Sequence, residues 1–505
     1  WELCFADLLL GARPGADGKP GGGFDLILGN PPWLKVEWNE SGILGERNPV
    51  FAIRKISASE LAKLRADAFR QFPGLQADWT DELQEAEGTL NFLNAVQNYP
   101  LLKGVQTNLY KCFMPLAWRL NNTQGVTGLL HPEGPYDDPK GGNLREAVYA
   151  RLRRHFQFVN EAHLFAEVHN QTRYSVNIYG AEKPVPAFDQ IANLFVPATV
   201  DASYEQDGQG QVGGYKNEAG KWNFTGHRDR IVHVNEPVLT TFAQLYDEPG
   251  TPARRARLPA LHAGALSSAL AKLAVYPRRL ADVGEGYFST VMFDETYAQQ
   301  DGTLSRRPST DPGFAATPYD WVLSGPHFFV ANPFNKTPFK ACSSNKAYAQ
   351  IDLETLPDDC LPRTNYRPMP DRGEYLRRTP RVSWLDWETL EVPWEGLLDH
   401  EHPAQPTDED TELYRVNRTR RRAVTEFFRY INRRRINANN ERTLISTLVP
   451  PGAAHVHPVL SLAFRDSADL VGLVGFTASV VADFFIKSTG LGDLYDSTLA
   501  RLPHV

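Results

Sequence analysis

The stretch Phe24-Asp-Leu-Ile-Leu-Gly-Asn-Pro-Pro-Trp33 is the part of the sequence that decides the fold. Residues 24–28 form a short apolar run that ends at a Gly-Asn-Pro-Pro turn, which is typical of a buried central strand in a parallel sheet. Pro31 and Pro32 prevent both a strand and a helix from continuing directly after it. Because open α/β sheets bind their ligands in loops at the carboxyl ends of their strands, the sequence predicts a ligand-binding loop at 29–33.

The residues around this stretch alternate between strand and helix patterns. The apolar run 1–10 predicts a buried strand, and residues 36–105 are mostly helical in pattern. Further helices are predicted from Asn108 onward and over 144–156, and they alternate with predicted strands over 126–130 and 173–179. This alternation predicts an α/β fold up to about residue 180.

The pattern changes beyond residue 180. Residues 270–380 are rich in proline, glycine, aromatic and β-branched residues, which indicates a separate β-rich or mixed domain. From about residue 410 the pattern returns to helix, and the acidic, proline-containing stretch 400–412 is the best candidate for a linker. We therefore expect three parts, with boundaries at 1–185, 186–405 and 406–505.

Composition excludes several classes of protein. The 505 residues are 42% hydrophobic and 22% charged, which is ordinary for a soluble globular protein and excludes a collagen-like or disordered polymer. The four cysteines lie too far apart for CxxC pairs and the histidines lack zinc-ligand spacing, so we expect no metal site and a reducing, cytoplasmic location. The longest apolar stretch, 470–486, contains Asp483 and falls short of the roughly 20 residues that span a bilayer, so we expect a buried helix.

The charge is unevenly distributed along the chain. Residues 414–442 hold ten arginines and two glutamates, a local charge of +8 in a chain whose net charge is −7. Two interpretations remain open: a basic surface that faces nucleic acid, and a helix that is paired with acidic neighbours. Seven of the arginines cannot all share one helix face, so the first interpretation leaves some of them for phosphates: Arg418, Arg420, Arg421, Arg422, Arg433, Arg434 and Arg435.

The loop at 29–33 has the residues that a particular chemistry requires. The exocyclic amine of a nucleobase is a poor nucleophile, because its lone pair is delocalised into the ring. The side-chain oxygen of Asn30 and the carbonyl of Pro31 would accept hydrogen bonds from the two amino N–H groups. Trp33 would stack on a base rotated out of the duplex. The alternative is a plain Asn-Pro-Pro turn followed by a core tryptophan.

The stretch 24–33 resembles motif IV of amino-group DNA methyltransferases, in the adenine-N6 class whose target domain follows the catalytic domain. This resemblance implies catalytic roles for Asn30, Pro31, Pro32 and Trp33. Upstream, Phe5-Ala-Asp-Leu-Leu9 is similar to the strand of motif III. By that resemblance Asp7 would bind the adenine of S-adenosylmethionine with Leu8 beside it, and Asn30 and Pro32 would also contact the cofactor.

Further segments extend the resemblance. Residues 108–113 and 125–132 are similar to the helix and strand that follow in the family, and the region around 165–179 is similar to the part that contributes a second aromatic against the base, either Phe165 or Tyr174. Residues 440–450 and 476–503 are similar to C-terminal blocks of large methylases. Such methylases occur in type IIG restriction–modification enzymes and in the BREX and DISARM phage-defence systems, of which the DISARM adenine methylase is the nearest in its motifs.

The resemblance implies both a fold and a function. The fold would be α/β, the C-terminal part of a Rossmann-like methyltransferase sheet, followed by a mixed α+β target-recognition domain and a helical C-terminal region. The function would be site-specific adenine-N6 methylation of double-stranded DNA with S-adenosylmethionine, in a restriction–modification or phage-defence system with further subunits and without a membrane. DNA contact by the seven arginines would fit this function.

The family's glycine-containing cofactor loop should precede motif III, and the residues before Phe5 leave no room for it. We therefore expect this chain to be the later portion of a longer protein and to bind S-adenosylmethionine poorly by itself. Two other functions remain open. One is methylation of protein glutamine or RNA guanine, where the same amine problem arises, and the other is a non-catalytic DNA-recognition subunit of a defence complex.

Overall fold

The computed structural model describes residues 3–10, 22–54, 56–105, 108–308, 314–328, 333–339, 342, 347–358, 362–402, 413–437 and 440–504. The chain divides into two compact units, Trp1–Ala274 and Val275–Val505, and each is described by itself. The strands of the first unit are β1 Phe24–Gly29, β2 Asn121–Pro132, β3 Leu152–Val159, β4 Arg173–Tyr179, β5 Ala187–Leu194 and β6 Val232–Asn235. Its helices are α1 Ala6–Leu9, α2 Glu40–Arg47, α3 Val50–Ile53, α4 Ala58–Gln71, α5 Leu75–Asn94, α6 Leu109–Leu120, α7 Gly134–Asp137, α8 Gly142–Arg151, α9 Ala198–Glu205, α10 Glu236–Tyr246 and α11 Ala265–Ala274.

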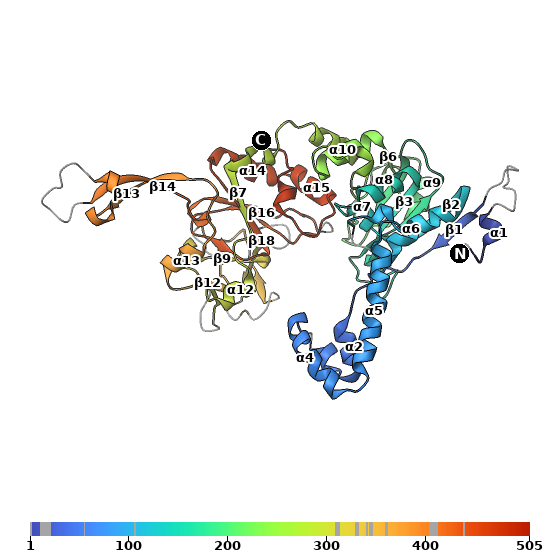
Figure 1. Ribbon diagram of the computed structural model, residues 1–505. Helices are drawn as coiled ribbons and strands as arrows, with labels where there is room; N and C mark the ends of the chain where they lie inside the picture. The colour runs from blue at the N-terminus through green and yellow to red at the C-terminus, as the bar shows by residue number, and fades with distance from the viewer. Residues whose placement is uncertain are drawn as a thin grey trace. The chain divides into compact units, whose positions relative to one another are not determined.

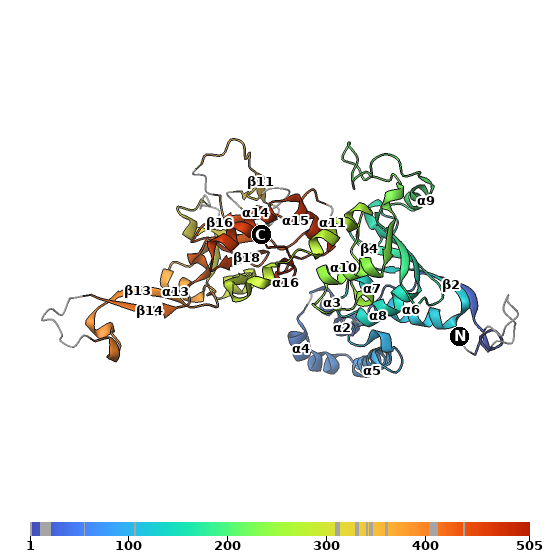
Figure 2. The same ribbon diagram turned by 90° about the horizontal axis from the view of Figure 1, so that it is seen from above.

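A six-stranded mixed sheet with the order β1-β2-β4-β3-β5-β6 is the centre of the first unit (Figures 1 and 2). β1 pairs with β2 in parallel, and β3 pairs with β5 in parallel. β4 lies antiparallel between β2 and β3, so β1, β2, β3 and β5 all run in one direction. Their carboxyl ends therefore meet at one edge of the sheet. The α/β class predicted for this region is confirmed, although β5 and β6 extend the unit beyond residue 185.

Two strand predictions near the start of the chain are corrected. β1 forms at the predicted place but is the first strand of its sheet instead of a central one, and its Leu26 and Leu28 are 57% and 71% exposed. The predicted strand over 1–10 is wrong, because α1 forms within it and has no buried residue. Its backbone is satisfied locally, since the N–H groups of Leu9 and Leu10 donate to the carbonyls of Phe5 and Ala6 at 2.9 Å.

The predicted helix over 144–156 is wrong in its second half. α8 ends at Arg151, and β3 begins directly at Leu152. The backbone of β3 pairs with β4 on one side and with β5 on the other. These contacts with distant strands outweigh the local helix preference of residues 152–156. The strand predicted over 173–179 is confirmed as β4.

Helices α2 to α5 form a subdomain that is inserted after the loop at 29–33, which confirms the helical prediction for 36–105. Ser57 caps α4 by accepting a hydrogen bond from the N–H of Glu60 at 3.3 Å. The insertion leaves and rejoins the sheet at adjacent points, because Lys35 pairs with Asn108 in a β-bridge. Figure 1 shows α5 carrying the other insertion helices away from the sheet. The subdomain has its own buried core: Leu44, Phe51, Leu61, Ala68 and Leu75.

The second unit is built around a four-stranded antiparallel sheet with the order β16-β15-β18-β7. Of the shorter two-stranded sheets, β9–β17 and β8–β12 contribute residues to the cores around Trp321 and Tyr366. The strands are β7 Tyr287–Thr290, β8 Leu304–Arg306, β9 Val322–Leu323, β10 Lys336–Pro338, β11 Tyr348–Gln350, β12 Tyr366–Pro368, β13 Asp386–Val392, β14 Tyr414–Arg420, β15 Arg429–Arg433, β16 Ser446–Val449, β17 Ala454–His455 and β18 Val459–Phe464. The helices are α12 Glu295–Gln300, α13 Arg372–Arg378, α14 Ser467–Thr477, α15 Val480–Ser488 and α16 Asp496–Leu499.

The prediction of a helical C-terminal region is wrong for 414–464, which contains β14 to β18, and holds only for α14 to α16. Half-buried and exposed residues alternate along β14, as is typical of a strand: Tyr414, Val416 and Arg418 face one side, and the residues between them face the other. The stretch 470–486 is not one helix, since α14 and α15 are separated by a bend of 76°. Within the described residues, no single helix is long and apolar enough to cross a membrane. Most of the predicted linker, residues 403–412, lies outside the described residues.

Candidate functional site

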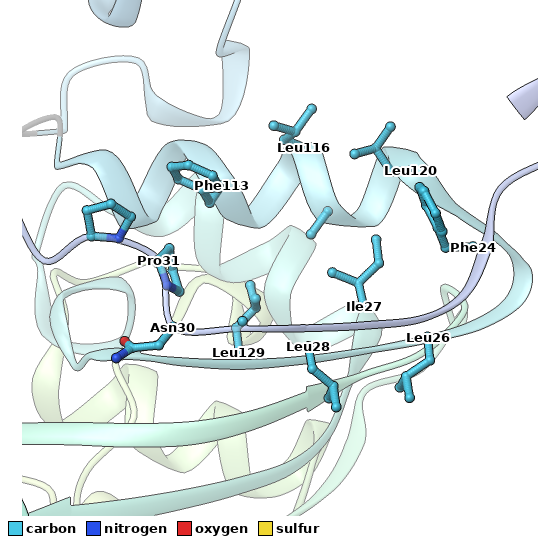
Figure 3. Close-up of a pocket in the computed structure, with 13 residues that line it drawn as sticks. Phe24, Leu26, Ile27, Leu28, Asn30, Pro31, Phe113, Leu116, Leu120 and Leu129 are labelled. Atoms are coloured by element: carbon cyan, nitrogen blue, oxygen red, sulfur yellow. The ribbon is translucent and has the colours of Figure 1, made fainter. Parts of the chain in front are cut away.

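The loop at 29–33 lies at the carboxyl end of β1, as predicted. Asn30 is exposed there, whereas Pro31 is buried. Beside the loop, a groove of about 440 Å³ runs between β1 and α6. Figure 3 shows Asn30 at the end of this groove where β1 stops, with Phe113 and Leu116 of α6 on the facing wall. The polar side chain of the motif is therefore accessible, and its backbone corner is held in place.

Trp33 contacts both candidates for the second aromatic residue. Its ring centroid lies 5.3 Å from that of Phe165 and 5.6 Å from that of Tyr174. Tyr174 is only 2% exposed, because its ring also stacks on Phe158 at 5.6 Å. Burial raises the pKa of its hydroxyl. Trp33 and Phe165 are half-buried and keep part of their surfaces open, so these two can offer a ring to a ligand while Tyr174 supports them from behind.

A buried asparagine holds Phe165 in place, and sequence reasoning missed it. Asn160 follows β3 and is fully buried. Its side-chain amide donates to the carbonyls of Phe165 and Val168 at 2.9 and 2.8 Å, and its oxygen accepts from the N–H of Phe165 at 3.1 Å. Three hydrogen bonds from one side chain fix the loop that carries Phe165. An Asn directly after an apolar strand is the local signal that would have pointed to this residue.

A second missed residue, Glu133, lies at the carboxyl end of β2. It is buried and accepts from Gln157 at 2.9 Å and contacts His155 at 3.2 Å. Burial alone would raise the pKa of this carboxyl, but His155, together with hydrogen bonds from Ser175 and Gln157, lowers it to about 2. The ionised Glu133 therefore ties β2, β3 and β4 together at the same edge of the sheet as Asn30.

The structure separates the predicted cofactor residues into two groups. Asp7 and Leu8 lie on α1, where Phe5 packs on Phe24 at 5.2 Å and the carbonyl of Leu8 accepts from Gly23. Phe24 begins β1, whereas Asn30 and Pro32 follow its other end. A strand of this length spans roughly 17 Å, so Asp7 and Leu8 are not brought together with Asn30 and Pro32.

The groove fits part of S-adenosylmethionine. Its walls are almost wholly apolar, and among the described residues that line it Asn30 is the one with a polar side chain. An adenine ring or the carbons beside the sulfonium suit such walls, but the ammonium and carboxylate of the methionine part need charged or hydrogen-bonding partners. The described residues therefore do not hold the whole cofactor at this groove.

Ion pairs occupy most of the arginines predicted to bind DNA. Arg418 pairs with Glu401 at 2.6 Å, Arg420 with Glu426 at 2.8 Å, and Arg422 with Glu426 at 3.2 Å. Arg434 and Arg435 pair with Asp493 at 3.6 and 3.2 Å, and Arg433 is half-buried. Arg421 is exposed, and among the described residues its guanidinium pairs with no carboxylate. These residues lie on strands and loops, so the expectation of a basic helix is wrong.

No family model and no curated protein matches this sequence. Solved structures of restriction–modification proteins are distantly similar. The type IIL enzyme MmeI in complex with DNA has 10% identity and a TM-score of 0.30, over 89% of this chain and 42% of that one. The type IIG restriction endonuclease BpuSI has 12% identity and a TM-score of 0.26, over 85% and 45%.

A modification subunit of a putative type I restriction enzyme from Vibrio vulnificus has 12% identity and a TM-score of 0.21, over 46% of this chain and 38% of that one. The chain thus spans less than half the length of each of these three proteins. The similarity is distant and assigns no specific family. The six-stranded mixed sheet is consistent with a Rossmann-like, methyltransferase-type fold.

Proposed function

We propose that this chain is the catalytic and target-binding part of a site-specific DNA adenine-N6 methyltransferase that uses S-adenosylmethionine. One observation supports this more than any other. Asn30 and Pro32 of an Asn-Pro-Pro corner are exposed at the carboxyl end of β1, and the tryptophan that follows packs against a second, partly exposed aromatic ring. By the sequence resemblance, the activity would belong to a restriction–modification or phage-defence system, with double-stranded DNA as substrate and other subunits as partners.

In this proposal the chain holds the target amine and activates it without a strong base. The Asn30 oxygen and the Pro31 carbonyl accept hydrogen bonds from the two N–H groups of the amine, which reduces delocalisation of the nitrogen lone pair into the ring. Trp33 and Phe165 stack against the base, which offsets the few kcal/mol that unstacking costs. The proton released after transfer goes to solvent. S-adenosylmethionine supplies the methyl group when it is bound.

β1 has an exposed face and no described neighbour on one edge, and this bears on the polar cofactor contacts that the groove lacks. Leu26 and Leu28 are exposed and point away from α6, with Leu28 lying over Gly128 of β2, whereas Ile27 points toward the groove (Figure 3). Within the described residues, β1 has a neighbouring strand, β2, on one side only. Parallel strands are ordinarily covered on both faces, and an apolar edge strand is a template for pairing. We propose that a further parallel strand pairs with β1 and that its polypeptide supplies the polar cofactor contacts that the groove lacks.

The test is made at the native genomic locus, so that all partners are present. We expect sequencing that detects modified bases to find N6-methyladenine in one short DNA motif, and we expect deletion of the gene to remove it. Asn30→Ala should remove it as well. Gln84→Ala, which truncates an exposed amide on α5, should leave it unchanged.

A second candidate function is a non-catalytic DNA-recognition subunit. None of the described residues that line the groove is charged, which favours this function because such a subunit would not need to hold the methionine part of the cofactor. Modification that persists unchanged in the Asn30→Ala strain would establish this second function. A wild-type strain without N6-methyladenine would overturn the first.

A further inference from the structure

The antiparallel ribbon β13–β14 extends away from the body of the second unit (Figures 1 and 2). Seven residues of each strand pair in continuous register, from Asp386 opposite Arg420 to Val392 opposite Tyr414. Side chains alternate between two faces of the ribbon, and the two faces differ sharply in how they are covered.

One face is closed by the chain itself. Glu388 and Glu426 pair with Arg420, and the segment after β13 folds back so that Glu401 pairs with Arg418. The carbonyl of Gly396 accepts a further hydrogen bond from Arg418 at 2.9 Å. The arginines of this face are therefore used in holding the ribbon together.

The other face is bare. Trp387 is 78% exposed, and the side chain of Arg415 is also 78% exposed. Between them, the hydroxyl of Thr389 donates to the oxygen of Asn417 at 2.7 Å across the two strands. Glu391 accepts from Nε of Arg415 at 3.1 Å. A tryptophan this exposed, on a face with hydrogen-bonding side chains, is typical of a binding surface.

The cross-strand contacts leave defined groups free for a ligand. Glu391 accepts from Nε of Arg415, and the Arg415 side chain is 78% exposed, so its two terminal nitrogens are available as a pair of donors. Thr389 satisfies the oxygen of Asn417, which leaves the amide N–H₂ as a donor. Arg421 adds an exposed guanidinium at the base of the ribbon. Two guanidiniums against one carboxylate give this face a net positive charge.

We propose that the bare face of β13–β14 docks in the major groove of double-stranded DNA, with Arg415 and Asn417 reading base edges. This inference rests on the proposed function and names the element that recognises its target. A two-stranded ribbon fits the major groove, which is about 12 Å wide. An arginine fork matches the two acceptors of guanine, and an amide donor matches an acceptor on a base edge. Trp387 packs on the sugar–phosphate edge, and Arg421 contacts a phosphate.

The experiment uses the full chain and a pool of 40-base-pair duplexes with a randomised centre. Bound DNA is selected and sequenced, and affinity is measured by fluorescence anisotropy. Wild-type protein should enrich one sequence motif. Arg415→Lys and Asn417→Ala should each relax the preference at one or two positions by about 5- to 150-fold, with little change in affinity for random DNA. Trp387→Ala should weaken binding to all sequences.

The matched control for Trp387→Ala is Tyr297→Ala, because Tyr297 is 71% exposed on α12 of the same unit. It should change neither affinity nor motif. If the wild-type protein enriches a motif and the ribbon variants enrich the same motif equally well, the ribbon proposal is wrong while the proposed function stands. If the wild-type protein enriches nothing, the ribbon proposal is wrong, whereas the proposed function is decided separately by N6-methyladenine at the native locus. If Trp387→Ala instead abolishes self-association in sedimentation experiments and leaves DNA binding intact, the face is an interface between copies.

Discussion

The sequence predicts a ligand-binding role for the loop at 29–33 and DNA contact for seven arginines within the segment 414–442, and the side chains of these two regions differ in whether they are free in the folded chain. In the loop, Asn30, the polar side chain that we propose acts on the target amine, is exposed, and Pro31 is buried. In the segment, five of the seven arginines predicted to bind DNA are engaged by carboxylates of the chain itself.

The difference arises because a proline-containing loop and a count of arginines carry different kinds of structural information. Prolines restrict the backbone wherever they stand, so a short proline-containing loop after a strand keeps its geometry in the folded chain. A count of arginines measures charge only, and it does not say which guanidiniums have a partner. The bare face of the ribbon carries its hydrogen-bonding groups on Arg415 and Asn417, which the count did not single out.

The largest effect is expected from Asn30→Ala. Loss of one preorganised hydrogen-bond partner at a reacting centre typically slows catalysis by about 100- to 1000-fold. Because Asn30 is exposed, the midpoint of thermal unfolding should not change. Methylation rates on DNA that contains the target motif, together with calorimetry, measure both quantities. A large fall in the unfolding midpoint would mean that Asn30 is a structural residue of the turn.

Trp33→Ala should have the next largest effect. Stacking of a base on an aromatic ring contributes about 1–3 kcal/mol, so we expect target binding to weaken by about 5- to 150-fold. The unfolding midpoint should also fall, because Trp33 packs on Phe165 and Tyr174. Trp33→Phe should restore most of the binding. If both variants bind as tightly as wild type, Trp33 is only a core residue, which is the plain-turn interpretation of the motif.

Local patterns predicted the elements that depend on local sequence. β4 over Arg173–Tyr179 and the helices within 36–105 were predicted because periodicity is a property of neighbouring residues. The isolated apolar run before Leu10 was misjudged because a strand needs a partner, and α1 satisfies its own backbone instead. β14 was misjudged because arginine is a good helix former, whereas its long stems also pack well on a ribbon face.

The site divides in the same way. Asn30 and Trp33 are adjacent in sequence and could be found from it. Trp33 packs on Phe165, and Asn160 holds Phe165 in place by hydrogen bonds. Both contacts depend on β3 and β4, which are distant from Trp33 in sequence. The separation of Asp7 from Asn30 across the length of β1 could not be found from sequence either, because it depends on α1 not entering the sheet.

Arg421→Ala and Arg420→Ala test the distinction between free and paired arginines directly. We expect Arg421→Ala to reduce the slope of log Kd against log salt concentration by about one, as for the loss of one phosphate contact. Arg420→Ala should leave the slope unchanged and lower the free energy of unfolding by about 0.5–1 kcal/mol, since Arg420 is paired but more than a third exposed. If the slope of log Kd against log salt concentration is the same for the two variants, free and paired arginines do not differ in their contacts with DNA.

The smallest effect is a dependence of the ribbon base on pH. Burial would raise the pKa of Glu426, but Arg420, the N–H of Ala423 and Arg422 lower it below its ordinary value. A carboxyl whose pKa is lowered by folding adds stability above its ordinary pKa of about 4.5, and this stability is lost as the pH falls through the lowered value. Hydrogen exchange of the Ala423 amide, which donates to Glu426 at 2.9 Å, should therefore lose protection below about pH 4.5 after correction for the intrinsic rate. Glu426→Gln should show weaker protection that no longer changes with pH in this range, because its side chain does not titrate. Protection in wild type that stays constant down to pH 3 would mean that the arginines at the ribbon base do not depend on this carboxylate.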